Sequence, residues 1–192
     1  MSQGQLKLIT KGAVYSYGNL YYNFRDSFQK LEISKREIND VLILGLGTGS
    51  IIQLLGQKFK LNASYDVVEI DPEVVALFEK YKKGFVSSSC NVHVADAFQY
   101  MKSNQKNYDL ICMDIFCDKT VPVIFESEEF LLNLKNALNE NGLLIYNRLA
   151  IDTNDQQKNE SFFKIFENVF PDASILKLDF NWMFVVDRKL LI

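Results

Sequence analysis

The stretch Val41–Gly56, VLILGLGTGSIIQLLG, decides the fold, because it joins a short apolar strand, a glycine-rich turn and the start of a helix. Gly45, Gly47 and Gly49 let the backbone turn sharply and come close to a ligand. The helix that follows would point its free amide groups at whatever lies in the turn. This order is typical of the first unit of a nucleotide-binding α/β fold.

Downstream of this unit, short apolar or β-branched runs alternate with longer amphipathic ones, the pattern of strand–helix units around a parallel sheet. Five such strands are expected. The segments 173–179 and 181–189 then predict a terminal antiparallel hairpin of strands six and seven. The fold class is therefore α/β, a Rossmann-like sheet of seven strands, mostly parallel with a C-terminal antiparallel hairpin.

Local signals set the expected helix ends. Asp71 should cap the helix that begins at Pro72, and Gly84 should stop it. A second helix is expected to start at Glu126, with acidic residues in its first turn, and to run to the Asn-Gly pair at 141–142.

Size and charge indicate one domain with a small-molecule ligand. The chain has 192 residues, of which 48% are hydrophobic, so it can bury a sizeable core. A net charge of -3 gives no general attraction to nucleic acid or to an anionic membrane, and neither is expected as a partner. No apolar run is long enough to span a bilayer and the N-terminus lacks a hydrophobic signal core, so a cytoplasmic location is expected.

The sequence gives no support for a metal site. Its cysteines, Cys90, Cys112 and Cys117, have no zinc-type spacing and are interpreted as small hydrophobic residues. The single histidine, His93, lies within a predicted strand, where a buried structural role is favoured over catalysis. No metal cofactor is therefore expected.

Residues 1–40 are predicted to form an arm or lid on the domain that spans 41–192, and not an independent domain. The aromatic stretch 14–24, VYSYGNLYYNF, could cover the ligand pocket, form a homodimer contact or pack on the sheet edge. The sequence leaves these three roles open. Residues 27–40 are interpreted as a polar helix or loop.

An acidic residue after the second strand identifies the ligand type. Glu69 follows Gly47 by 22 positions, where a carboxylate can accept hydrogen bonds from both ribose hydroxyls. The sixth position of a dinucleotide fingerprint, which should be glycine, is Ser50. The pattern thus favours an adenosine-type ligand without a pyrophosphate over a dinucleotide.

These features together resemble the spermidine synthase-like branch of the S-adenosylmethionine-dependent methyltransferase superfamily. The resemblance covers about residues 38–147 and rests on four segments in the same order: VLILGLGTGS, VVEIDPEVV, VADAFQYM and YDLICMDIF. It implies S-adenosylmethionine, or its decarboxylated form, as the cofactor.

The resemblance also implies roles for individual residues. The glycine turn, including Thr48, would lie along the tail of the ligand, and Glu69 would hold the ribose. Ile70 would pack on the adenine, Asp96 and Ala97 would contact its amino group, and Asp114 would face the transferred group. Asp96 is equally well explained as the N-cap of the helix that follows it.

Asp114 is the candidate catalytic residue, because an attacking amine must lose a proton and a carboxylate can take it. Asp118, Glu126, Glu128 and Glu129 could add negative charge, although the three glutamates are also explained by the helix dipole. Thr48 stands where the synthases have an acidic residue, and Ile43 stands where methyltransferases usually have one.

The sequence therefore predicts a group transferase that binds S-adenosylmethionine, and it favours a methyltransferase with an unknown small acceptor over an aminopropyltransferase. Two alternatives stay open. One is a spermidine synthase-like aminopropyltransferase of polyamine biosynthesis, and the other is a binding protein that keeps the adenosyl site without catalysis.

Overall fold

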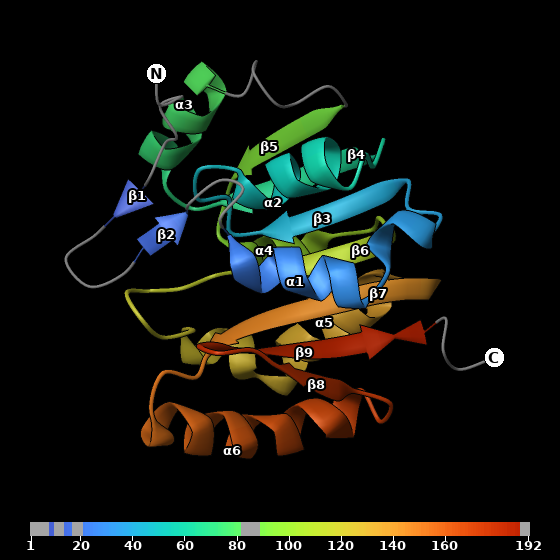
Figure 1. The fold of residues 1–192 in the computed structure, drawn as a ribbon. Coiled ribbons are helices and arrows are strands. Elements are labelled where there is room, and N and C mark those ends of the chain that lie inside the picture. The colour runs from blue at the N-terminus through green and yellow to red at the C-terminus, as the bar shows by residue number, and fades with distance from the viewer. Residues whose placement is uncertain (1–7, 10–13, 17–20, 82–88, 189–192) are drawn as a thin grey trace.

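The computed structural model describes residues 8–9, 14–16, 21–81 and 89–188, and its central feature is one seven-stranded sheet (Figure 1). The strand order is β5-β4-β3-β6-β7-β9-β8. The strands are β3 (Asp40–Leu44), β4 (Ser64–Glu69), β5 (Cys90–Val94), β6 (Tyr108–Met113), β7 (Leu138–Leu149), β8 (Ser174–Lys177) and β9 (Asn181–Asp187).

The pairing of these strands confirms the predicted fold class. β3, β4, β5, β6 and β7 all run parallel to one another, whereas β9 runs antiparallel to both β7 and β8. The chain leaves β3 toward β4 on one side and later returns to β6 on the other. Ligands of open α/β sheets bind beyond the carboxyl ends of the strands at such a switch point.

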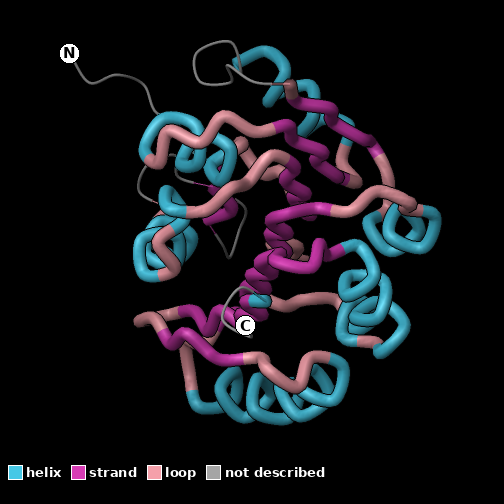
Figure 2. The backbone as a smooth tube through the Cα atoms, turned by 90° about the vertical axis from the view of Figure 1, so that its right-hand side faces the viewer, coloured by secondary structure: helices cyan, strands magenta, loops and turns pink. Residues whose placement is uncertain are grey.

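Helices cover both faces of the sheet, which makes three layers (Figure 2). On one face lie α1 (Tyr22–Lys30), the 3-10 helix η2 (Ile33–Lys35), α2 (Ser50–Gln53) with its π-helical continuation η3 (Leu54–Lys58), and α3 (Pro72–Tyr81). On the other face lie α4 (Ala97–Ser103), the 3-10 helix η5 (Val123–Glu126), α5 (Glu128–Ala137) and α6 (Thr153–Val169). A separate antiparallel pair is formed by β1 (Leu8–Ile9) and β2 (Val14–Ser16).

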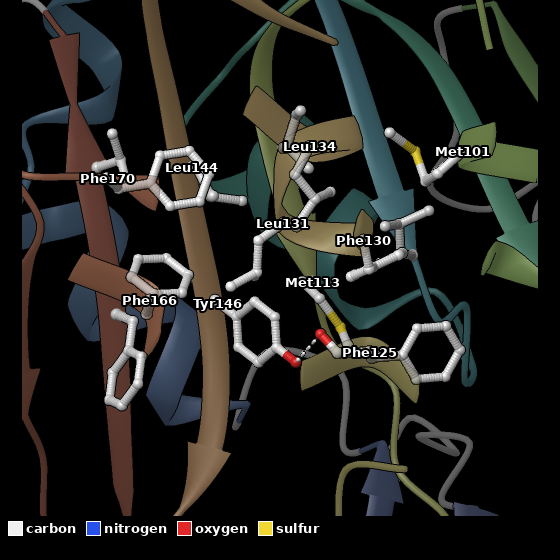
Figure 3. Close-up of a cluster of buried hydrophobic side chains, with 14 of the residues drawn as sticks. Met101, Met113, Phe125, Phe130, Leu131, Leu134, Leu144, Tyr146, Phe166 and Phe170 are labelled. Carbon is white, nitrogen blue, oxygen red and sulfur yellow. Dashed lines mark hydrogen bonds between the residues drawn. The ribbon is translucent and has the colours of Figure 1, made fainter. Parts of the chain in front are cut away.

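Aromatic side chains fill the core between the sheet and α5 and α6 (Figure 3). Phe162 and Phe166 of α6 pack on Tyr146 of β7, all three fully or almost fully buried. The Tyr146 hydroxyl donates to the Phe125 carbonyl over 3.2 Å, so the buried phenol keeps a hydrogen-bond partner.

The core on the opposite face includes α1, contrary to the interpretation of residues 27–40 as a polar helix or loop. The helix begins at Tyr22 and fully buries Phe24 and Phe28. Ile43, which is 1% exposed, lies in the same cluster. An acid at position 43 would therefore have to displace packed apolar side chains on this face of the sheet.

Two local predictions need correction. The helix that was expected to reach residues 141–142 ends at Ala137, because Leu138 already pairs with Tyr108 in the sheet. Asn139 then donates to Asp109 over 2.6 Å, which favours the extended backbone over another helical turn. Cys117 is exposed and so is not a core residue.

The capping predictions are confirmed where the structure describes them. Asp71 precedes α3 and accepts a hydrogen bond from the Glu73 amide over 2.8 Å. The expected stop at Gly84 lies outside the described residues. Across the described ranges, none of the helices combines the length and the apolar character needed to cross a bilayer.

Candidate functional site

The glycine turn is joined directly to the strands on both sides of β3. The Gly45 amide donates to the Val68 carbonyl over 2.9 Å, and the Asp114 amide donates to the Leu44 carbonyl over 2.8 Å. Gly45 has a φ of 94°, and a Cβ there would lie 2.4 Å from the Asp114 carbonyl oxygen. Position 45 therefore requires glycine for its conformation and for its closeness to β6.

Glu69 links the glycine turn to the loop after β4. Its Oε2 accepts from the Leu46 amide over 3.0 Å and its Oε1 accepts from the Asp71 amide over 3.1 Å. These two bonds fix the carboxylate at the carboxyl end of β4. Each carboxylate oxygen can accept a second hydrogen bond, so capacity for a ribose diol remains.

The other predicted ligand-contacting residues lie at the same edge of the sheet. The apolar side chain of Ile70 is 66% exposed, which suits a residue that a planar ring would cover. Asp96 accepts from the Gln99 amide over 3.0 Å and is thus the N-cap of α4, where Ala97 is buried. Its cap role is observed; its contact with a ligand stays a prediction.

The turn residues complete this edge. Gly47 and Gly49 have positive φ values of 52° and 81°, and Thr48 lies between them, partly exposed. Gly49 precedes the first residue of α2. The backbone of the turn therefore approaches the carboxyl edge where Glu69 and Asp114 lie.

Asp114 follows β6 and is held by two uncharged donors. The Tyr21 hydroxyl donates to its Oδ2 over 2.6 Å, and the Asn147 side-chain amide donates to its Oδ1 over 2.9 Å. Tyr21 comes from the residue before α1 and Asn147 from β7. A single carboxylate thus ties the N-terminal segment to the centre of the sheet.

Burial raises the pKa of Asp114, the bonds from Tyr21 and Asn147 lower it and the negative charge of Glu69 raises it, and together these effects bring the pKa to about 7. Burial together with the Asp114 charge also raises the pKa of the Tyr21 phenol well above its ordinary value, so Tyr21 stays a neutral donor. A carboxylate with a pKa near 7 can both take and release a proton at neutral pH.

The other acidic candidates are placed differently. Glu126 forms an ion pair with the almost fully buried Arg148, with 2.6 Å between Oε1 and Nη1, so its charge is balanced. Both residues line a cleft of about 600 Å³ between the loop after β6 and α6. Glu128 and Glu129 occupy the first turn of α5, and Asp118 is exposed with a φ of 54°.

Three residues of the Asp114 surroundings were not among the predicted site residues: Tyr21, Asn147 and Asn181. Asn181 donates to Asn147 over 2.8 Å. Asn147 ends the apolar run LLIYN and Asn181 begins the apolar run NWMFVV, and a polar residue at the end of such a run is the signal that could have marked them. Among the described residues, no group of three or more His, Cys, Asp or Glu side chains could hold a metal ion.

Comparison with known proteins places this geometry in context. Residues 31–173 match the family described as the spermine/spermidine synthase domain. The chain is 34% identical over 113 residues to a polyamine aminopropyltransferase of Vibrio vulnificus, covering 57% of this chain and 38% of that protein. It is 32% identical over 149 residues to the eEF1A lysine and N-terminal methyltransferase of Xenopus laevis, covering 72% of this chain and 21% of that protein.

A solved structure has the same fold. Human methyltransferase-like protein 13, in complex with SAH, superposes with a TM-score of 0.67 at 25% identity, over 80% of this chain and 73% of that one. The chain spans well under half the length of the two curated relatives described above.

Proposed function

Because the chain belongs to the spermine/spermidine synthase domain family, we propose that it is an S-adenosylmethionine-dependent transferase that methylates an amine nitrogen of a small acceptor. The observation that carries this proposal is Asp114, a partly buried carboxylate with a pKa near 7 directly beside the glycine turn. An amine must lose a proton as its nitrogen forms a new bond, and this carboxylate is suited to take it.

The residues at the carboxyl edge fit an adenosyl ligand. Glu69 is fixed by two backbone amides and retains acceptor capacity for the ribose. Ile70 offers an exposed apolar surface to the adenine, and the glycine turn brings backbone close to the ligand's tail. The methyltransferase-like protein with this fold was solved with SAH bound, which supports the same class of ligand here.

The bound cofactor would supply a carbon activated by its positively charged sulfur. Because that sulfur can keep the electron pair of the C–S bond, the donor would need no acid for its leaving group, and Asp114 would take the proton that the amine nitrogen loses as its lone pair bonds to the carbon. Tyr21 orients the carboxylate and covers it from solvent. Positioning supplies much of the remaining barrier reduction.

The turn lacks the acid that the synthases would use to hold the aminopropyl amine, which counts against the decarboxylated donor. Thr48 occupies the turn position where the resemblance to the synthases leads us to expect an acid for the aminopropyl amine. Ile43 is buried in the core, so it offers no charge either.

Aminopropyl transfer is the second candidate, and one observation favours it. The relative from Vibrio vulnificus, a polyamine aminopropyltransferase, is 34% identical over 113 residues. In this case decarboxylated S-adenosylmethionine would be the donor and Asp114 would keep its role as base.

A ligand-stabilisation experiment separates these proposals. Thermal unfolding is measured with S-adenosylmethionine, its decarboxylated form, methylthioadenosine and NAD. A ligand at 100 times its dissociation constant should add about 2.7 kcal/mol to the free energy of unfolding. We expect the largest gain with S-adenosylmethionine, whereas a gain with the decarboxylated form alone would favour aminopropyl transfer. No gain with any adenosyl compound would overturn both proposals.

Glu69→Ala tests the ribose assignment, because it should abolish the stabilisation by the adenosyl ligand. An unchanged gain would show that Glu69 does not hold the ribose. Turnover is then measured by mass spectrometry with a panel of small amines. A wild-type protein that binds the cofactor and modifies no amine would instead support a binding protein without catalysis.

A further inference from the structure

A line of hydrogen bonds runs from the surface of α1 through two strands to Asp114. The Tyr22 hydroxyl lies 3.1 Å from Asn181 Oδ1, and Asn181 Nδ2 lies 2.8 Å from Asn147 Oδ1. Asn147 Nδ2 lies 2.9 Å from Asp114 Oδ1. The two asparagines are 1% and 4% exposed, so water does not compete for these amides.

The direction of this line follows from its inner end. An ionised carboxylate only accepts hydrogen bonds, so Asn147 must turn its NH₂ group toward Asp114. The oxygen of Asn147 then faces Asn181, which must in turn present its own NH₂ group. The remaining oxygen of Asn181 accepts from Tyr22, and every member of the line donates toward Asp114.

We propose that Asn147 and Asn181 are positioning residues that keep Oδ1 of Asp114 as an acceptor and thereby make Oδ2, on the Tyr21 side, the atom that takes the substrate proton. The chemical reason is the difference between the two partners of Asp114. An amide NH₂ can only donate, and protonation of Oδ1 would use a lone pair of that oxygen and weaken the bond, whereas the Tyr21 hydroxyl can turn and accept from a protonated Oδ2.

This inference rests on the proposed function for its catalytic meaning, but the hydrogen-bond line exists without any ligand. The titratable groups that face Asp114 are Tyr21 before α1, Glu69 on β4 and Cys112 on β6. None of these three side chains is cationic. Among the described residues, the side chains that donate to Asp114 are therefore neutral, which makes the orientation of Asn147 important.

The test measures the titration of Asp114 in the ligand-free protein, by carbon NMR of protein labelled at the aspartate carboxyl groups. The Asp114 signal is assigned by its loss in Asp114→Asn. Asn147→Leu and Asn181→Leu remove one amide each at nearly constant volume. Asn159→Leu is the matched control, because Asn159 is also buried and bonded through both side-chain atoms but does not touch Asp114.

We expect Asn147→Leu to raise the midpoint from about 7 by about one unit, since one neutral donor to the carboxylate is lost. Asn181→Leu should raise the midpoint by less, because Asn147 stays in place and only gains the freedom to flip its side-chain amide. Asn159→Leu should leave it unchanged. If Asn181→Leu does not fold, Tyr22→Phe takes its place with a smaller rise expected.

Two results would overturn the inference. The first is an unchanged midpoint of the Asp114 titration in Asn181→Leu, or in Tyr22→Phe if that variant replaces it. The second is a rise of this midpoint in Asn159→Leu equal to that in Asn181→Leu. These outcomes do not depend on whether the protein transfers a group. Where turnover is measured, kcat of Asn181→Leu should fall and its acidic limb should move to higher pH, while KM for the adenosyl ligand stays the same. A change in KM alone would contradict a positioning role.

Discussion

Two aspartates, Asp66 buried in the central sheet and Asp114 partly buried at its carboxyl edge, have similar partners and opposite electrostatics. Asp114 accepts from a tyrosine and an asparagine. Asp66 of β4 also accepts from an asparagine, Asn91 over 3.2 Å, and a tyrosine, Tyr108 over 3.3 Å, but Lys106 adds an ammonium group at 3.1 Å. His93 Nε2 also lies 3.3 Å from Oδ1 of the Asp66 carboxylate.

The cation decides what each carboxylate can do. Burial raises the pKa of Asp66, but the hydrogen bonds from Lys106, His93 and Asn91 outweigh it and hold the pKa below its ordinary value. At Asp114 the donors are neutral, burial dominates, and the pKa rises to about 7. Asp66 is thus a permanently ionised structural acid that ties β4 to its neighbours, whereas Asp114 can exchange a proton at neutral pH.

The largest difference expected between substitutions of the two aspartates is in turnover. Asp114→Asn should lower kcat by about 10²- to 10⁴-fold, the usual contribution of a general base, while the affinity for the adenosyl ligand stays nearly unchanged. Asp66→Asn should keep kcat close to wild type once folded protein is compared. Steady-state kinetics and calorimetric binding test this. Loss of adenosyl-ligand binding in Asp114→Asn would make Asp114 structural instead.

For the free energy of unfolding, the order is reversed, and the substitution of Asp66 should be the more damaging one. Asp66→Asn replaces an acceptor of several bonds with a group that cannot accept all of them, so the free energy of unfolding should fall by about 2 kcal/mol. Because the pKa of Asp66 is lowered on folding, its contribution is present above pH 4 and is lost as the pH falls through the folded value. Urea unfolding at pH 7 and at pH 3 checks both statements. An equal cost at both pH values would contradict the electrostatic explanation.

The contribution of Asp114 to stability depends on pH in the opposite direction, because folding raises its pKa from 3.8 to about 7. The stability that the protonated carboxyl contributes is full below pH 4 and is lost as the pH rises through 7. Asp114→Asn should therefore be about 1–2 kcal/mol more stable than wild type at pH 8, with a smaller advantage at pH 5. Thermal unfolding at the two pH values measures this, and a gain that does not grow with pH would show that Asp114 is not desolvated.

The smallest effect on stability is expected from replacing Lys106, the cation beside Asp66. Lys106→Met removes the ammonium group from Asp66 and should cost about 1 kcal/mol, since Lys106 is 43% exposed and partly screened by water. The carboxyl titration of Asp66 should move upward, toward the behaviour of Asp114. Lys102→Met is the control, because the Lys102–Glu129 pair is exposed on both sides and should contribute little. Equal effects in the two variants would remove the distinction between the two aspartates.

The sequence was sufficient for the sheet and for the acids at its carboxyl edge. Each strand of the parallel part is a local apolar run, and Glu69, Asp96 and Asp114 follow three of these runs directly. Strand ends meet at one edge in any parallel sheet, so their approach required no knowledge of tertiary contacts. The end of α5 was misjudged because the pairing of Leu138 overrode the turn signal at 141–142, and the interpretation of residues 27–40 as a polar helix or loop missed the burial of Phe28 and Ile33.

What only the tertiary structure decided is the environment of Asp114. Tyr21 lies 93 positions away in the chain and Asn147 lies 33 positions away, and no local pattern relates them to Asp114. The sequence alone determined that an acid would stand at the end of β6. Whether that acid would be paired with a cation, as Asp66 is, or desolvated among neutral donors depends on contacts between distant segments, and these contacts set its pKa because desolvation and hydrogen bonding act only in the folded chain.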